Sequence, residues 1–235
     1  MNILDKIIVD KKREVILKKS IIPVSQLEAS IFFEKKTISL STNLRNSSSG
    51  IIAEHKRRSP SKAEINYSFT VEEVTKGYED AGACAISVLT DGKYFGGSLD
   101  DLLLARATVN IPLLRKEFIV DEYQILEAKA HGADLILLIA AVLTRKEIKS
   151  LSEFAHSLNL EVLLKLHLYH RFPLIRCHRS EKKVCSMGIF LGLSSQMWFR
   201  YLQVIFLWCQ KGNSHKRFQM VLKLQNQNHQ PPKTL

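Results

Sequence analysis

Residues 121–165 read DEYQILEAKAHGADLILLIAAVLTRKEIKSLSEFAHSLNLEVLLK. Gly132 stands where glycine commonly follows the end of a helix, and Thr144 is typical of a residue that caps the start of the next one. The spacing of apolar residues predicts a helix at Asp121 to His131, a strand at Leu135 to Ala140, a helix at Thr144 to Leu158 and a strand at Glu161 to Leu166. Helices and apolar strands therefore alternate along this stretch.

The same alternation extends back through the chain. We expect strands at Ile51 to Ala53, Cys84 to Leu89 and Ile111 to Leu114, helices at Ile3 to Lys18, Ser25 to Phe33, Val71 to Ala81 and Leu99 to Ala105, and a Ser/Asn-rich loop at Asn43 to Gly50. Continuous apolar strands between amphipathic helices indicate a parallel sheet covered on both faces. An open doubly wound sheet and a (β/α)8 barrel both fit. Glu54, Lys56 and Lys116 favour the barrel, because barrel enzymes place their chemistry at strand C-terminal ends.

The charge of the chain is unevenly distributed. The 235 residues carry a formal net charge of +11. Residues 168–235 hold 11 Lys and Arg against one acidic residue, Glu181, so their net charge is +10 and residues 1–167 are left with +1. We therefore expect two parts, a partial barrel domain over residues 1–167 and a basic tail over residues 168–235 that is disordered or misfolded.

Composition also excludes several classes of protein. Four cysteines do not form a disulfide framework in a chain of this length, the mixed charges at the N-terminus are unlike a signal peptide, and no apolar run reaches the roughly 18 residues of a membrane span. We expect a cytoplasmic protein with no membrane partner. The basic tail leaves nucleic-acid binding as an alternative, which is disfavoured because a binding surface needs an ordered scaffold. The tail residues His167, His170, Cys177, His178 and Cys185 lack the paired spacing of zinc ligands, so we expect no metal.

Four segments carry a more specific signal. They are IIAEHKRRSPS at residues 51–61, SVLTDGKYFGGS at residues 87–98, PLLRKEFIV at residues 112–120 and GADLILLI at residues 132–139. In order and spacing they resemble the indole-3-glycerol-phosphate synthase family over residues 1–167. The resemblance implies a (β/α)8 barrel with additional N-terminal helices.

The resemblance also implies a reaction. The family converts 1-(2-carboxyphenylamino)-1-deoxyribulose 5-phosphate to indole-3-glycerol phosphate, with loss of CO₂ and water, as a step of tryptophan biosynthesis. This carbon–carbon lyase reaction needs no metal or organic cofactor, and its partner is a phosphorylated small molecule. A ketone must be protonated while the anilino ring attacks it, and a cation at a strand end suits that task.

Residue roles follow from motif position. Lys116 matches the general-acid lysine of the family, Lys56 the lysine that contacts substrate carboxylate and phosphate, and Glu54 the glutamate that orients the catalytic groups. Ser59 lies in the substrate-side loop after the first strand. The apolar walls around the anthranilate ring are matched by Phe95, Phe118 and Leu137. From spacing alone, Lys56 and Lys116 would be ordinary loop residues, and Phe95, Phe118 and Leu137 would be core residues. His55 is expected to pack against its neighbours or to support the site from behind, and not to be catalytic.

Two departures from the family pattern predict little or no activity. Lys165 stands where the family has the glutamate that acts as general base, so the charge is reversed beside Lys116. After His167 the Asn-Arg segment, the Ser-Glu-Ser-Gly segment and the glycine-rich phosphate cradle of the family are missing. Back-translation of residues 195–206 in another frame resembles the seventh-strand segment of the family, which indicates a reading-frame shift. The alternatives to an active synthase are an inactive truncated barrel and a protein that binds nucleic acid through its tail.

Overall fold

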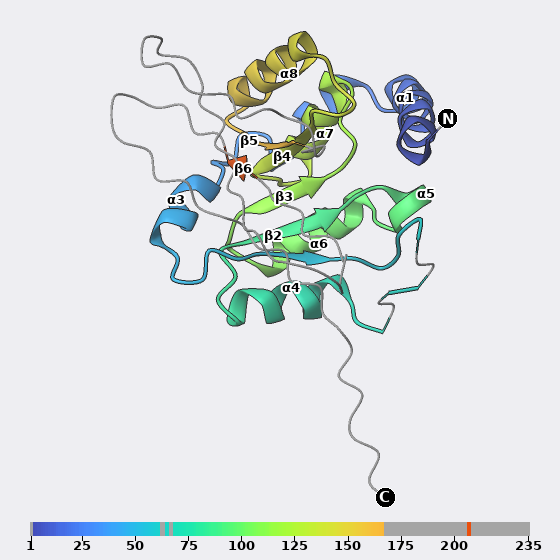
Figure 1. The fold of residues 1–235 in the computed structure, drawn as a ribbon. Coiled ribbons are helices and arrows are strands. Elements are labelled where there is room, and N and C mark those ends of the chain that lie inside the picture. The colour runs from blue at the N-terminus through green and yellow to red at the C-terminus, as the bar shows by residue number, and fades with distance from the viewer. Residues whose placement is uncertain (1, 62–63, 66–67, 167–205, 208–235) are drawn as a thin grey trace, which may run out of the picture.

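A single curved sheet organises the protein (Figure 1). The structure, a computed structural model, describes residues 2–61, 64–65, 68–166 and 206–207. The parallel strands are β1 (Ile52–His55), β2 (Ala85–Leu89), β3 (Leu113–Lys116), β4 (Leu135–Ile139) and β5 (Glu161–Lys165), hydrogen-bonded in sequence order. The two-residue strand β6 (Phe206–Leu207) pairs antiparallel with β5. The five predicted parallel strands are confirmed, and β3 continues two residues beyond Leu114, so that Lys116 is its last residue.

Side-chain alternation divides the sheet into an inner and an outer face. The inner face is packed by Ile52, Ala85, Leu114, Leu137 and Leu163, and the outer face by Ile86, Val88, Leu113, Ile136 and Leu138. Strands β2 and β4 are buried along their whole length, which agrees with their continuous apolar sequences, whereas β1 and β5 are only partly buried.

The main helices of the four connections between successive parallel strands pack on the outer face. They are α4 (Val71–Asp80), α6 (Leu99–Thr108), α7 (Glu122–Ala130) and α8 (Arg145–Ser157), and each contributes buried residues to the outer cluster. These helices cover the outer face and the inner cluster packs the inner face, so of the two predicted arrangements the barrel is favoured. Strands added in sequence order through connections of one hand place every helix on the same side, and this is the arrangement of a (β/α)8 barrel rather than of a doubly wound sheet.

Several helix ends are fixed by local hydrogen bonds. Thr144 and Glu147 form a reciprocal capping box at the start of α8, which confirms the predicted cap. Gly132 follows α7 with φ +79°, and a Cβ there would lie 2.6 Å from Cγ of Arg106. Glycine is therefore required at this predicted helix stop.

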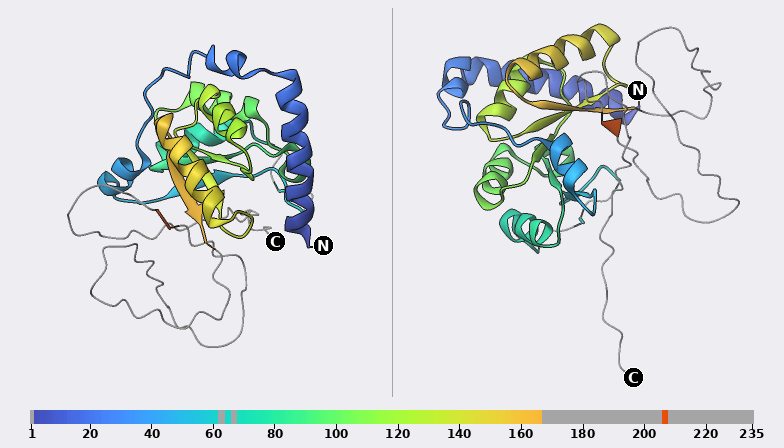
Figure 2. Two further views of the ribbon diagram at one scale, coloured as in Figure 1. Left: turned by 90° about the horizontal axis from the view of Figure 1, so that it is seen from above. Right: turned by 90° about the vertical axis from the view of Figure 1, so that its left-hand side faces the viewer.

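The N-terminal segment differs from the expectation in two places. Helix α1 (Ile3–Ile21) is present, but α2 (Val24–Glu28) ends five residues before the predicted Phe33. A third helix, α3 (Leu40–Asn46), occupies part of the stretch expected to be a loop. It forms because Ser39 caps its first turn and because Leu40 and Leu44, four residues apart, insert into the inner cluster. Figures 1 and 2 place α3 beyond the N-terminal ends of the strands, whereas the short helix α5 (Gly92–Phe95) lies beyond their C-terminal ends.

The expectations for the basic tail and for its His and Cys residues fall on residues 167–205 and 208–235, outside the described part of the chain. Among the described residues, no helix combines the length and the apolar character that crossing a bilayer requires. The same residues contain no group of three or more His, Cys, Asp or Glu side chains placed to hold a metal ion.

Candidate active site

The C-terminal ends of β1–β5 on the inner face, termed here the strand mouth, bring Glu54 and Lys116 together. Nζ of Lys116 donates to Oε2 of Glu54 at 2.8 Å, and Oγ of Ser87 donates to the same oxygen at 3.2 Å. Strand register explains the contact. Glu54 pairs with Ser87 across β1 and β2, and Lys116 lies at the end of β3 on the same inner face. The side chains of Glu54 and Lys116 are only 5% and 16% exposed, so the ion pair is largely shielded from water.

Lys56 adds a second cation to this carboxylate. Its Nζ lies 3.8 Å from Oε1 of Glu54, and its side chain is 17% exposed. Burial lowers the pKa of Lys56, the carboxylate of Glu54 opposes that change, and the ammonium of Lys116 adds to it. Two lysines therefore share one carboxylate, and Lys116 holds the shorter contact.

An aromatic pair borders the mouth. The ring centroids of Phe95, from α5, and Phe118, which follows β3, lie 6.0 Å apart with planes tilted by 36°. Phe118 packs against the inner cluster, and Leu137 is buried within that cluster at 1% exposure. The structure thus places the two phenylalanines at the mouth and Leu137 in the core below them.

The polar contact of Ser59 is with a neighbouring residue of its own loop. Ser59 lies in the loop after β1, and its hydroxyl is within hydrogen-bond distance of the hydroxyl of Ser61, at 3.2 Å. The described residues give it no hydrogen bond to Glu54, Lys56 or Lys116.

Lys165 ends β5 on the same inner face. It is two residues beyond Leu163, which packs in the inner cluster, and it pairs in register with Ile139 of β4. Its backbone oxygen accepts a hydrogen bond from N of Ala140 at 3.0 Å. The inner face therefore carries three lysines at its C-terminal edge, at the ends of β1, β3 and β5.

A buried charge cluster supports the mouth from the side of α1, and sequence reasoning missed it. Nζ of Lys11 lies 3.0 Å from Asp91, which caps α5, and 3.2 Å from Glu117, the residue after Lys116. Burial opposes the charge of Lys11, but the carboxylates of Glu117 and Asp91 outweigh it and raise the pKa of the amine. Lys11 is far from these partners in sequence, and only its place among the buried positions Ile7 and Val15 of the helix gave a signal.

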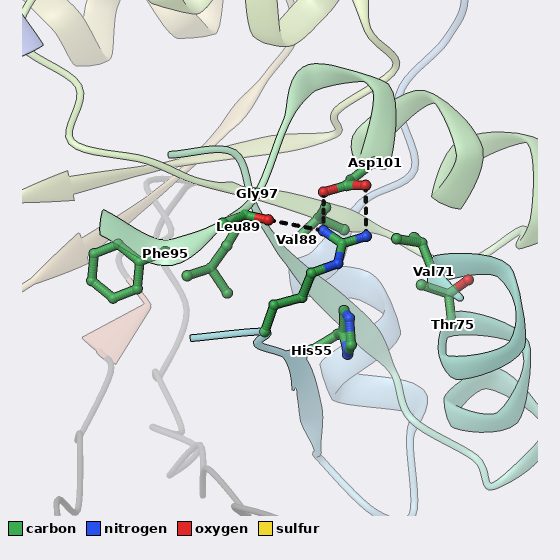
Figure 3. A pocket seen from close by; sticks show the side chains of 10 residues that line it. His55, Val71, Thr75, Val88, Leu89, Phe95, Gly97 and Asp101 are labelled. Atoms are coloured by element: carbon green, nitrogen blue, oxygen red, sulfur yellow. Dashed lines mark hydrogen bonds and ion pairs between the residues drawn. The ribbon is translucent and has the colours of Figure 1, made fainter. Parts of the chain in front are cut away.

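A second ion pair ties the loop after β1 to α6. The guanidinium of Arg57 donates to both carboxylate oxygens of Asp101, at 2.9 Å for Nη2, and to the carbonyl of Gly96 at 3.1 Å (Figure 3). The adjoining pocket, lined by His55 and Thr75 among others, has a volume of about 10 Å³. That is room for about one water molecule, so this pocket is too small for an organic substrate. Burial lowers the pKa of His55, and the charge of Arg57 lowers it further.

Comparison with known proteins identifies relatives of the described domain. The family model for indole-3-glycerol phosphate synthase matches residues 4–172. A protein of that name from Bacteroides thetaiotaomicron is 48% identical over 188 residues, which cover 80% of this chain and 70% of the relative. Proteins of the same name from Aliarcobacter butzleri and Mycobacteroides abscessus are 46% and 41% identical, each over 70% of this chain and over 64% and 61% of the relative. The chain thus spans between about three fifths and about seven tenths of the length of these three relatives.

Proposed function

The chain belongs to the indole-3-glycerol phosphate synthase family, and from this premise we propose that its strand mouth is built for the ring closure that the family carries out. The substrate is 1-(2-carboxyphenylamino)-1-deoxyribulose 5-phosphate, and the products are indole-3-glycerol phosphate, CO₂ and water. The pairing of Lys116 with Glu54 at 2.8 Å in a shielded site is the observation that carries the proposal.

Each residue of the mouth has a role in this reaction. Lys116 donates a proton to the substrate ketone as the anilino ring attacks it, since a shielded ammonium can both donate a proton and stabilise developing negative charge. Glu54 accepts the hydrogen bond of Lys116 and so holds the ammonium in place. Lys56, 3.8 Å from the other oxygen of Glu54, binds the anionic groups of the substrate.

Neighbouring side chains complete the binding site. Phe95 and Phe118 form the wall against which the anthranilate ring lies, with Leu137 as its floor, and this arrangement fits the 6.0 Å contact between the two rings. Ser59 contributes a hydroxyl from the loop above. The reaction uses no metal or organic cofactor. Because the substrate is a soluble sugar phosphate, we place the protein in the cytoplasm.

Lys165 is the reason that we expect slow turnover. The family glutamate at this position removes a proton late in the reaction, and an ammonium cannot accept one. Loss of a general base typically lowers the rate by about 10²- to 10⁴-fold. We further propose that residues 1–167 form the synthase part and residues 168–235 a separate basic tail that supplies no phosphate site. Without such a site, the remote binding energy that positions the reacting groups is lost.

Four proteins test this proposal. They are the chain itself, Lys165→Glu, a chimera whose residues 168–235 are replaced by the corresponding segment of the Bacteroides thetaiotaomicron relative, and the chimera with Lys165→Glu. Turnover is followed by the fluorescence of indole-3-glycerol phosphate. We expect little product from the chain or from Lys165→Glu alone, substrate binding with slow turnover from the chimera, and near-normal synthesis from the combination.

Two results would contradict the proposal. Robust turnover by the unaltered chain would mean that Lys165 and the tail have been misinterpreted. No turnover by the combined variant would mean that the mouth itself is not a synthase site. Lys116→Met in the combined variant is the matched control, and it should abolish synthesis while leaving the fold intact.

A further inference from the structure

Two of the three lysines of the mouth, Lys116 and Lys56, are held unequally by the carboxylate of Glu54. Nζ of Lys116 makes a 2.8 Å hydrogen bond to Glu54, whereas Nζ of Lys56 stands 3.8 Å from it. Within the described residues, the ammonium of Lys56 makes no hydrogen bond. Lys116 therefore makes the closer ion pair with Glu54, and Lys56 is a second cation in a site where both lysine side chains are less than one fifth exposed.

Such surroundings make it easier for Lys56 than for an exposed lysine to lose its proton. Desolvation disfavours the charged form of a lysine, and a neighbouring cation disfavours it further. Both effects lower the pKa of Lys56, although the carboxylate of Glu54 opposes them. A lysine desolvated in a pocket or placed beside a second cation is the usual form of an amine nucleophile.

We propose that Lys56 is a carbonyl-trapping nucleophile that forms an imine with small aldehydes or ketones bearing an anionic group. The anion is specified because Lys116 and Lys165 lie at the same edge of the inner face and provide positive charge beside the reacting amine. Glu54 and Lys116 would serve this second activity as the proton relay.

The proton balance of the reaction closes within these three side chains. The neutral amine of Lys56 attacks the carbonyl carbon, and the oxygen takes a proton from Lys116. Glu54 accepts the proton that the nitrogen loses, and its 2.8 Å hydrogen bond returns that proton to Lys116. The same relay then removes the second nitrogen proton and protonates the hydroxyl, which leaves as water. The sum is amine plus carbonyl giving imine plus water, with no oxidation or reduction.

This activity goes beyond the proposed synthase reaction, because it requires neither ring closure nor a phosphate site. The test uses the full chain incubated with glyoxylate, the probe, and sodium cyanoborohydride, which reduces each imine to a stable carboxymethyl-lysine. Peptide mass spectrometry then measures how fast each lysine is modified.

Lys149 is the matched control within the same molecule. Its Nζ also lies 3.8 Å from one carboxylate, that of Glu153, but its side chain is 77% exposed and belongs to α8, which packs on the outer face of the sheet. We expect Lys56 to be modified several times faster than Lys149 near neutral pH, and its rate to reach a plateau at lower pH. Equal or faster modification of Lys149, or modification at Lys116 in place of Lys56, would overturn the proposal.

Two variants test whether fast labelling of Lys56 reflects the nucleophilicity of its amine or only its accessibility to the probe. Lys56→Arg keeps the charge and should abolish labelling at this site without increasing it at Lys149. Glu54→Gln removes the carboxylate that favours the ammonium, so the plateau in the labelling rate of Lys56 should extend to lower pH, while loss of the proton relay should lower the rate on the plateau severalfold. An unshifted pH profile of Lys56 labelling in Glu54→Gln would contradict the electrostatic argument, and an unchanged plateau rate would contradict the relay. Equal rates with glyoxylate and the uncharged glycolaldehyde would refute the preference for an anionic carbonyl.

Discussion

The two ends of the parallel strands differ in how their charges are satisfied. At the N-terminal ends, Asp134 accepts hydrogen bonds from N of Ile38 at 2.7 Å, from N of Leu113 at 2.8 Å and from Arg106 at 2.9 Å. At the C-terminal ends, one carboxylate, that of Glu54, serves two lysines. Charge at the first end is matched by donors from three segments of the chain, whereas at the second end two lysines contact the same carboxylate.

The difference separates stability from function. Helix α3 closes the N-terminal end, with Leu40 and Leu44 in the inner cluster, and both carboxylate oxygens of Glu161 accept hydrogen bonds from Ser39 and Ser41. Barrel enzymes commonly place stability at the first end and chemistry at the second, and functional groups are kept at a cost in stability.

The largest effect is expected for Asp134→Ala at the N-terminal ends. The change leaves the buried guanidinium of Arg106 and two backbone N–H groups without their acceptor, and breaking a buried ion pair costs about 3–5 kcal/mol. Urea unfolding followed by circular dichroism measures the loss. Glu153→Ala, at an exposed position of α8, is the control and should change stability by less than about 0.5 kcal/mol.

The N-terminal ends are also where sequence reasoning was weakest. The five strands and the helices between them follow from local patterns, and the Thr144 cap was found because a capping box lies within four residues. Helix α3 was missed since its Ser/Asn-rich residues favour a loop and its two leucines are meaningful only once the sheet above them exists. Asp134 was quoted in a motif, but its acceptor role depends on backbone groups far away in sequence.

At the mouth, the motifs predicted the residues of the ion pair but not the buried charge cluster around Lys11 that supports it. Glu54, Lys56 and Lys116 were predicted to lie at strand C-terminal ends, and the structure brings the three side chains into contact there, while their roles stay a proposal. The link from Lys11 to Asp91 and Glu117 could not be predicted, because a lysine in a charged helix usually faces solvent. Long-range ion pairs leave no periodic signal in a single sequence.

Leu40→Ala tests how much apolar packing contributes to stability at the N-terminal ends of the strands. Leu40 is fully buried beneath the inner cluster, and truncating a buried leucine costs about 2–5 kcal/mol through lost burial and the cavity left behind. The matched control is Ile31→Ala, since Ile31 is 84% exposed. A change of similar size in both variants, measured by urea unfolding, would mean that α3 does not close the N-terminal ends as the structure has it.

Lys56→Met should raise the stability of the protein, whereas Asp134→Ala and Leu40→Ala should lower it. It removes the less well compensated cation of the mouth and leaves the hydrogen bond from Lys116 to Glu54 in place. Relief of desolvation and of like-charge repulsion should raise stability by up to about 1 kcal/mol. Thermal and urea unfolding at neutral pH measure the gain. A clear loss of stability would show that the charges of the mouth are as well matched as those at the N-terminal ends.

The smallest effect is the pH dependence of stability, which compares one histidine near each end of the strands. Burial is the main cause that lowers the pKa of both His55, at the end of β1, and His131, which follows α7. Arg57 lowers the pKa of His55 further while Asp101 raises it. For His131, Arg115 acts to lower the pKa, and the carbonyl of Glu127, to which its ring is hydrogen-bonded, opposes this.

A histidine whose pKa is depressed on folding binds protons more readily when the chain is unfolded. Its contribution to stability is complete above the unfolded pKa of about 6.5 and is lost as the pH falls toward the folded value. The free energy of unfolding should therefore decrease between pH 7 and pH 5, by no more than about 1.4 kcal/mol per pH unit for each histidine. His55→Gln and His131→Gln should each flatten this slope, in urea unfolding measured across the pH series. An unchanged slope in His55→Gln alone would place the acid sensitivity at the end of the sheet remote from the mouth.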